Sequence, residues 1–141
     1  MRGYTLVELA AVLLLLALAG AAVAPAGRRL RDRAAVLAAR ESVAGLVAEA
    51  RASALAWGGS SVHLEADPWR AWYMAGDSVR RTLALERELG VTVLLSRGRP
   101  STEVHFDALG LGRVASETLR FARGEAVAGL VLSGYARVRR W

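Results

Sequence analysis

Glu8 is the residue whose type and position most clearly suggest chemistry in this chain. It directly precedes an unbroken apolar run from Leu9 to Ala24. A carboxylate in such a run costs about 2.5–3.5 kcal/mol on insertion into a membrane, so it marks a functional site and needs a partner. If the chain were cut between Gly3 and Tyr4, the new amino terminus would lie about one helical turn from this carboxylate. The position therefore suggests ion pairing in a low dielectric.

The residues around Glu8 resemble the processing signature of type IV pilins and pseudopilins. The segment reads Gly3-Tyr4-Thr5-Leu6-Val7-Glu8-Leu9, a glycine followed by an aromatic residue, with glutamate fifth after the glycine. The resemblance implies that a membrane prepilin peptidase cuts after Gly3 and that the amine of Tyr4 is then methylated. Tyr4 differs from the family's usual phenylalanine by one hydroxyl group. The resemblance also implies that Glu8 pairs with the amine of a neighbouring subunit, which relieves the desolvation cost of both groups and sets the register of a filament.

The segment from Leu6 to Ala24 is long enough to cross a membrane. Its nineteen residues extend about 28 Å as a helix, close to the thickness of a bilayer core. A plain membrane anchor and a cleaved secretory signal ending at Ala22-Val23-Ala24 are the alternatives. Pro25 opposes the secretory signal because it would directly follow the cut, and Glu8 opposes it because it would lie in the hydrophobic stretch. We therefore favour the pilin-type leader.

The charges around this segment predict the opposite orientation from the family's. Arg28, Arg29, Arg31 and Arg33 follow the apolar run, whereas only Arg2 and the amino terminus precede it. The positive-inside rule would place the remainder of the chain in the cytoplasm. The resemblance instead implies a single-pass inner-membrane protein with a periplasmic head. Its helix would be stored in membrane lipid and then packed against other pilins or pseudopilins in a filament.

Pro25 is expected to kink or locally melt the helix. It lacks a backbone donor and clashes with the preceding turn, and Gly20 and Gly27 weaken the same stretch. Because family filaments loosen in this region, the resemblance implies that Pro25, like Glu8, takes part in filament assembly.

Beyond Gly27 the pattern becomes amphipathic. Apolar residues recur at helical spacing at Val36, Val43, Val47, Ala50 and Ala54. We expect one helix from about Tyr4 to Trp57, bent near Pro25 and ended by Gly58-Gly59. The expected parts are a leader (1–3), a transmembrane or filament-core helix (4–27), an amphipathic continuation (28–57) and a β-rich head (58–141).

The head is expected to be an antiparallel β-structure, which makes the chain α+β. Six to eight short strands are predicted around residues 62–64, 69–74, 91–95, 104–106, 118–121, 126–132 and 135–141, with glycines such as Gly76, Gly112, Gly124 and Gly134 in turns. Residues 106–110, a 118–121 strand and an apolar strand ending at Gly134 resemble the GspH/FimT group of minor subunits. That resemblance implies a minor pseudopilin of a type II secretion pseudopilus.

The alternative function is DNA binding for uptake by a FimT-like minor pilin. The net charge is +6 and all nineteen basic residues are arginine, so a polyanion is a plausible partner. Arg137 and Arg139 are predicted to share one face of a strand, with Arg140 on the other face and Trp141 beside them. Arginines beside an aromatic residue suit phosphate contact with base stacking. Arginines that guard an edge strand against association are the structural alternative.

The sequence gives little support for an enzyme. Cysteine is absent, which excludes a thiol nucleophile and a cysteine-ligated metal. His63 and His105 have no carboxylate or hydroxyl at a spacing typical of catalysis, and Ser60-Ser61 lacks the strand-to-helix turn of a nucleophile elbow. Glu65 and Asp67 are too few to bind a metal. We therefore expect no catalytic residue, no metal and no cofactor.

Overall fold

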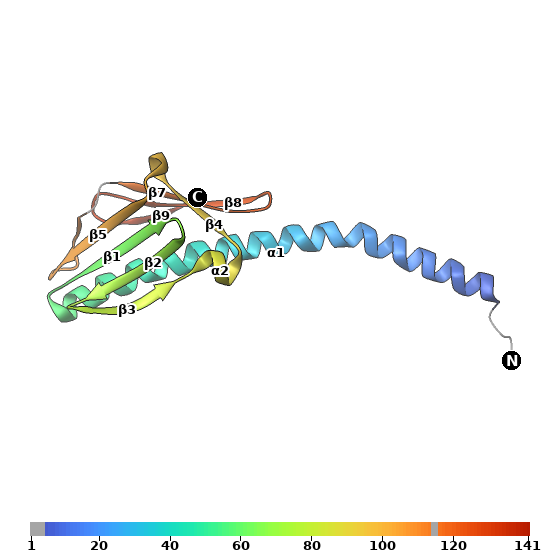
Figure 1. Ribbon diagram of the computed structural model, residues 1–141, viewed down its shortest axis with the longest axis horizontal. Helices are drawn as coiled ribbons and strands as arrows, with labels where there is room; N and C mark the ends of the chain where they lie inside the picture. Colours follow the sequence, from blue (N-terminus) through green and yellow to red (C-terminus); the bar gives the residue numbers. More distant parts are fainter. Residues whose placement is uncertain (1–4, 114–115) are drawn as a thin grey trace.

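A single long helix extends through the molecule, and the strands of the head pack against its second half. The computed structural model describes residues 5–113 and 116–141, with residues 22–24 described by their backbone alone. Helix α1 extends from Leu6 to Trp57 and ends at Gly58, whose φ of 78° lies in the left-handed region that glycine adopts without strain. Figure 1 shows its first half projecting from the head and its second half lying along the head. The predicted end of the helix at Trp57 is confirmed, whereas the predicted start at Tyr4 lies outside the described residues.

The helix is continuous through Pro25. The prediction of a local break is therefore wrong for this structure, although Figure 1 shows a gentle curve in the projecting half. Proline has no N–H to donate to the carbonyl four residues earlier, which is that of Ala21. The neighbouring turns keep their helical geometry.

The head consists of two antiparallel sheets. The first has the order β3-β2-β1-β5-β6 and the second the order β4-β7-β8-β9. The first comprises β1 (Gly59–Ala66), β2 (Trp69–Ala75), β3 (Ser78–Leu83), β5 (Ser101–Asp107) and β6 (Gly112–Arg113). The second comprises β4 (Thr92–Leu95), β7 (Glu117–Arg123), β8 (Ala126–Leu132) and β9 (Val138–Arg140). A short helix α2 (Leu85–Leu89) and a 3-10 turn η1 (Ser96–Gly98) complete the described elements.

The elements of the head differ from the prediction in five respects. The described residues form nine strands, more than the six to eight expected. Strand β3 and helix α2 were not predicted, Gly112 lies in β6 and not in a turn, and the last strand is only three residues long. The alternation along β2 and the bounds of β8 are as predicted. The α+β class and the antiparallel head are confirmed.

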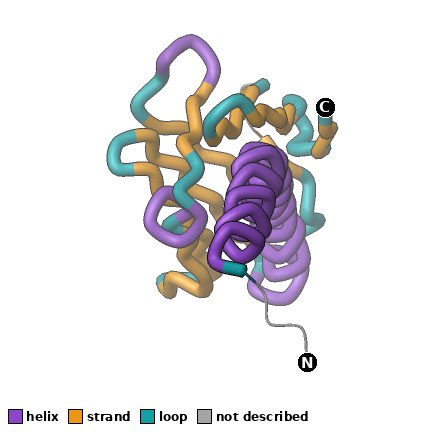
Figure 2. Tube along the Cα trace, turned by 90° about the vertical axis from the view of Figure 1, so that its right-hand side faces the viewer, coloured by secondary structure: helices purple, strands orange, loops and turns teal. Residues whose placement is uncertain are grey.

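The core lies between the second half of α1 and the inner faces of both sheets. In Figure 2, which looks along the helix, the strands surround α1 on one side only. The buried helix residues are mostly small, which allows close approach of the strands: Val36, Ala39, Val43, Leu46, Val47, Ala50 and Ala54. Opposite them lie larger side chains, among them Leu64, Phe106, Leu119, Phe121 and Leu130. Among the described side chains of α1, the first buried one is that of Ala35.

Candidate functional site

The start of α1 holds Glu8 in a reciprocal cap. Thr5 is the N-cap residue, and its Oγ1 accepts a hydrogen bond from the Glu8 backbone N–H at 3.3 Å. The Thr5 backbone N–H in turn donates to Oε2 of Glu8 at 3.4 Å. The carboxylate therefore lies at the positive end of the helix, where it compensates unpaired backbone donors. The Thr-x-x-Glu spacing of this cap is visible in the sequence.

Gly3 and Tyr4, the expected processing residues, lie outside the described residues. The cap nevertheless places the Glu8 carboxylate next to the backbone nitrogen of Thr5, one residue after Tyr4. Both Thr5 and Glu8 are exposed. The carboxylate is thus held toward the start of the helix by one long hydrogen bond, from the Thr5 backbone N–H.

The projecting half of α1 is apolar and uncovered. One window of 18 residues within it has a mean hydropathy of 2.6, and none of that window is buried against the head. By length and composition this segment is able to cross a membrane. Leu6 and Leu15 are 85% and 65% exposed, so the head provides no partner for this surface. Pro25 lies at the end of the same segment.

The C-terminal arginines occupy different environments. Nε of Arg140 donates to both carboxylate oxygens of Glu41 on α1, at 3.0 and 3.1 Å. This hydrogen bond, followed by that from Arg40, lowers the pKa of Glu41, and desolvation opposes the shift. Arg40 also donates to the backbone oxygen of Trp141 at 3.4 Å. Arg140 therefore fastens β9 to the helix.

Arg137 and Arg139 do not share a strand face. Strand β9 begins at Val138, so Arg137 lies in the preceding turn, where its backbone N–H donates to Oγ of Ser133 at 3.1 Å. Arg139 pairs in register with Val131 of β8 and is exposed. The predicted pairing of Arg137 with Arg139 is wrong because the strand is shorter than the alternation suggested.

The outer face of the second sheet combines positive charge with an aromatic ring. Arg120 is opposite Gly129 in the register, and the backbone N–H of Gly129 bonds to the carbonyl oxygen of Trp141 at 2.9 Å. A Cβ at Gly129 would come within 2.0 Å of the Trp141 ring, so the indole lies directly over that glycine. Arg139 lies on the same face. No Asp or Glu lies on this face among the described strand residues, because Glu117 is buried on the inner side.

Glu117 is a buried carboxylate that sequence analysis did not single out. Its Oε1 accepts hydrogen bonds from the backbone N–H of Ser96, at 2.5 Å, and from the Ser96 hydroxyl. Nη1 of Arg99 lies 3.6 Å from Oε2. A buried charge is tolerated only with such partners, so Glu117 fixes the connection between β4 and β5.

The two histidines have polar neighbours that the sequence did not reveal. Nε2 of His63 lies 2.9 Å from Oγ of Ser61 and 3.3 Å from Oε1 of Glu103. Nε2 of His105 lies 3.4 Å from the same carboxylate oxygen. The β1–β5 register brings these four residues together, although no hydroxyl or carboxylate stands at a catalytic spacing along the sequence.

This cluster does not have the arrangement of a catalytic triad. A triad histidine contacts the nucleophile through one ring nitrogen and the carboxylate through the other, whereas Nε2 of His63 makes both contacts. The ring also stacks on Trp72, with centroids 5.2 Å apart and planes 9° apart. Within residues 5–113 and 116–141 no group of three or more potential ligands is placed to hold a metal ion. The cluster is therefore a polar surface of the first sheet, in which His63 stacks on Trp72.

The fold is similar to that of a solved pilin. It matches the crystal structure of the type IV minor pilin FimU from Pseudomonas aeruginosa with a TM-score of 0.57. The match has 14% sequence identity and covers 76% of this chain and 88% of that chain. No protein-family model matches the chain, and the curated proteins give no match. The long apolar helix followed by antiparallel sheets is thus the type IV pilin fold.

Proposed function

We propose that this chain is a structural subunit of a type IV filament, specifically a minor pseudopilin of the GspH/FimT kind in a type II secretion pseudopilus. It has no enzymatic activity of its own in this proposal. Its helix is stored in the inner membrane with the head in the periplasm, and then packs against other pilins or pseudopilins. Assembly through this helix would contribute to protein secretion.

The division of α1 into two unlike halves carries the proposal. From Ala35 onward one face of the helix is buried by its own head, whereas the apolar half before Pro25 has no partner within the described chain. Exposed apolar surface of this extent needs lipid or other helices to cover it. The pilin-like fold supports the view that lipid covers this surface before assembly and that the helices of other subunits cover it afterwards.

Processing at Gly3 and Tyr4 would prepare the helix for assembly. Cleavage after Gly3 by a prepilin peptidase and methylation of Tyr4 would leave a cationic amine just before Thr5. The Glu8 carboxylate is held at that end of the helix by Thr5. An incoming subunit would offer its amine to this carboxylate, and the cost of leaving either charge unpaired in a low dielectric would fix the axial register.

Mass spectrometry of protein purified from cells that produce a prepilin peptidase tests the proposal. The expected mature chain begins at Tyr4 and carries one additional methyl group on its amine. The same chain from cells without the peptidase should retain Met1 to Gly3. A chain that keeps Met1 in both hosts, or that begins at Pro25, would overturn the proposal.

A second candidate, DNA capture by a minor pilin, has one favourable observation. The outer face of the second sheet carries Arg120 and Arg139 beside the Trp141 ring, with Arg137 in the adjoining turn. Arginines suit phosphate contacts, and an exposed indole suits base stacking. Arg140 is less available because its Nε is engaged by Glu41.

Titration with duplex DNA at two salt concentrations separates the two candidates. If the outer face of the second sheet binds phosphates, the affinity for DNA falls as the salt concentration rises. The double variant Arg120→Gln, Arg139→Gln should then reduce the slope of log K against log salt by about 2. The matched control is Arg87→Gln with Arg97→Gln, which removes two exposed arginines elsewhere. Binding that is absent, or equally weakened by both pairs, would favour the secretion subunit alone.

A further inference from the structure

The arginines that follow the apolar segment form a basic collar around α1. The collar consists of Arg28, Arg29, Arg31 and Arg33. We propose that it binds the phosphate groups of anionic phospholipids while the subunit is stored in the membrane. This inference rests on the proposed function, because it requires that the preceding part of α1 lies in the bilayer.

The spacing along the helix places the collar at the level of the headgroups. No charged residue occurs between Glu8 and Arg28, a stretch of residues 9–27 that extends about 28 Å at 1.5 Å per residue. The hydrocarbon core of a bilayer is about 30 Å thick. Because α1 is continuous through Pro25, this distance is fixed by the helix itself. When Glu8 lies at one boundary of the core, Arg28 lies at the other.

The collar precedes the point at which the head covers the helix. At about 100° per residue, the four arginines spread over about 200° of the helix circumference. Leu30 lies on the remaining face and is 70% exposed, and burial by the head begins at Ala35. Arginines that flank an exposed leucine suit a membrane interface, where the leucine reaches the acyl chains and the guanidinium groups reach the phosphates.

Most of the positive charge of the collar is uncompensated. Nε of Arg123 lies 2.9 Å from Oδ1 of Asp32, so the carboxylate within the collar is already paired. Arg29 lies 3.6 Å from Glu125, but both side chains are more than two-thirds exposed, and such a pair is weak. Among the described residues no carboxylate lies within ion-pair distance of Arg28, Arg31 or Arg33.

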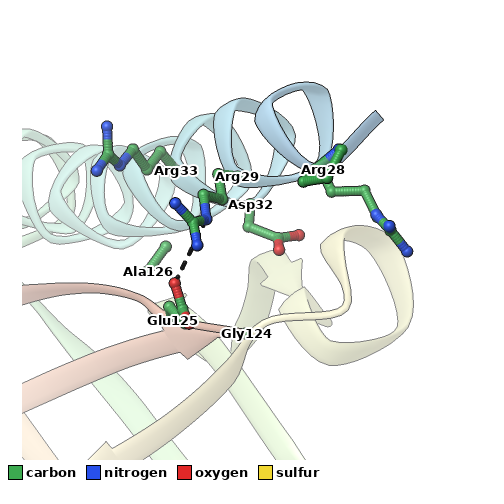
Figure 3. A pocket seen from close by; sticks show the side chains of 8 residues that line it. Arg28, Arg29, Asp32, Arg33, Gly124, Glu125 and Ala126 are labelled. Atoms are coloured by element: carbon green, nitrogen blue, oxygen red, sulfur yellow. Dashed lines mark ion pairs between the residues drawn. The ribbon is translucent and has the colours of Figure 1, made fainter. Parts of the chain in front are cut away.

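The close view shows where an anion would have access. Figure 3 shows Arg28 and Arg33 extending away from Asp32 and Glu125 in opposite directions along the helix. Between the helix and the β7–β8 turn lies an open hollow of about 380 Å³ with Pro25 at its edge. A guanidinium group offers paired N–H donors to phosphate oxygens, so each free arginine is a suitable phosphate ligand.

The test measures lipids bound to the full chain. The chain is purified in detergent, mixed with equal amounts of phosphatidylglycerol and phosphatidylcholine, and analysed by native mass spectrometry. Wild type should retain phosphatidylglycerol preferentially. Replacing Arg28, Arg31 and Arg33 together by Gln should reduce this preference by about fivefold per arginine, about a hundredfold in all. The matched control replaces Arg87, Arg97 and Arg113 by Gln, three exposed arginines outside the collar, and should retain the preference.

Further measurements distinguish failure of the proposed lipid site from failure of the proposed membrane anchor. Addition of inorganic phosphate at millimolar concentration should leave the lipid preference unchanged, whereas its loss would show a site for free phosphate instead. Equal retention of both lipids by wild type, or equal loss in the two triple variants, would overturn the collar. Flotation with vesicles of phosphatidylcholine alone tests the anchor separately. A chain that fails to float lacks the proposed anchor, whatever its lipid preference in detergent.

Discussion

Nε of Arg140 lies 3.0 Å from Oε1 and 3.1 Å from Oε2 of Glu41, across ninety-nine positions of sequence. This pair joins the final strand β9 to the middle of α1. Arg40 adds a second hydrogen bond to Oε1 at 3.1 Å. The three side chains therefore form a charged, hydrogen-bonded cluster outside the apolar core, which links α1 to β9.

The contact between Glu41 and Arg140 predicts a specific dependence of folding stability on pH. The pKa of Glu41 in the folded chain lies below its ordinary value of 4.5, chiefly because Arg140 donates to the ionised form. A lowered folded pKa gives stability that is present above pH 4.5 and is lost as the pH falls through the folded value. Urea unfolding of the full chain in detergent should therefore separate wild type from Glu41→Gln at neutral pH, and the difference should disappear at acid pH. Glu88→Gln, which removes an exposed carboxylate of α2, should leave the neutral-pH stability unchanged; an equal loss in that variant would contradict the role of the pair.

The cap at the start of α1 allows the two roles of Glu8 to be separated. Under the proposed function, Glu8→Ala should leave cleavage after Gly3 intact and reduce incorporation into filaments by about tenfold or more, since the charge proposed to set the register is removed. Thr5→Ala removes only the hydroxyl of the cap and costs about 1 kcal/mol of helix stability. It keeps the carboxylate, so incorporation should remain near the wild-type level. Both are measured by immunoblotting of sheared filaments and of whole cells. Normal incorporation of Glu8→Ala would remove the register role.

The contact between Gly129 and Trp141 predicts a non-additive pair of substitutions. A Cβ at position 129 would overlap the indole, so Gly129→Ala must displace the ring and should cost about 1–3 kcal/mol. In the background of Trp141→Ala the same substitution should cost much less, because nothing is left to displace. A double-mutant cycle by chemical unfolding measures the coupling, which we expect to exceed about 1 kcal/mol. Additive effects would mean that the ring does not rest on the glycine in solution.

Because only the second half of α1 is covered by the head, truncation of an apolar side chain should affect the stability of the head differently in the two halves. Leu46 is fully buried under the sheets, and Leu46→Ala should destabilise the head by about 2–5 kcal/mol. Leu14 is 62% exposed in the projecting half, and Leu14→Ala should change head stability by less than about 0.5 kcal/mol. Urea unfolding monitored by tryptophan fluorescence gives both values. Similar losses in the two variants would contradict the separation of the helix into a covered and an uncovered half.

The extended elements were predictable because their side chains alternate or repeat. The stripe from Val36 to Ala54 marked the buried face of α1, and the alternation of Trp69, Ala71 and Tyr73 marked β2. Strand β3 escaped prediction because five of its six residues are exposed. It lies at the edge of the first sheet, where burial imposes no alternation.

The sites were less predictable because their members come from distant parts of the chain. Glu8 was identifiable from the charge in an apolar run, and its cap was readable from the Thr-x-x-Glu spacing. The contact between Glu41 and Arg140 depends on where β9 crosses α1, and the neighbours of His63 depend on the register of β1 with β5. No local pattern encodes either arrangement.

The ion pair between Asp32 and Arg123 marks the point from which α1 is attached to the head. From Asp32 onward the helix is joined to the β7–β8 hairpin and to the core, so this part of α1 and the head form one packed unit. Stretching or bending of an assembled fibre would then be absorbed ahead of Asp32, in the turns that contain Gly20, Pro25 and Gly27. If the chain is assembled as proposed, each subunit would lengthen or bend in the projecting part of α1 while its head keeps its shape.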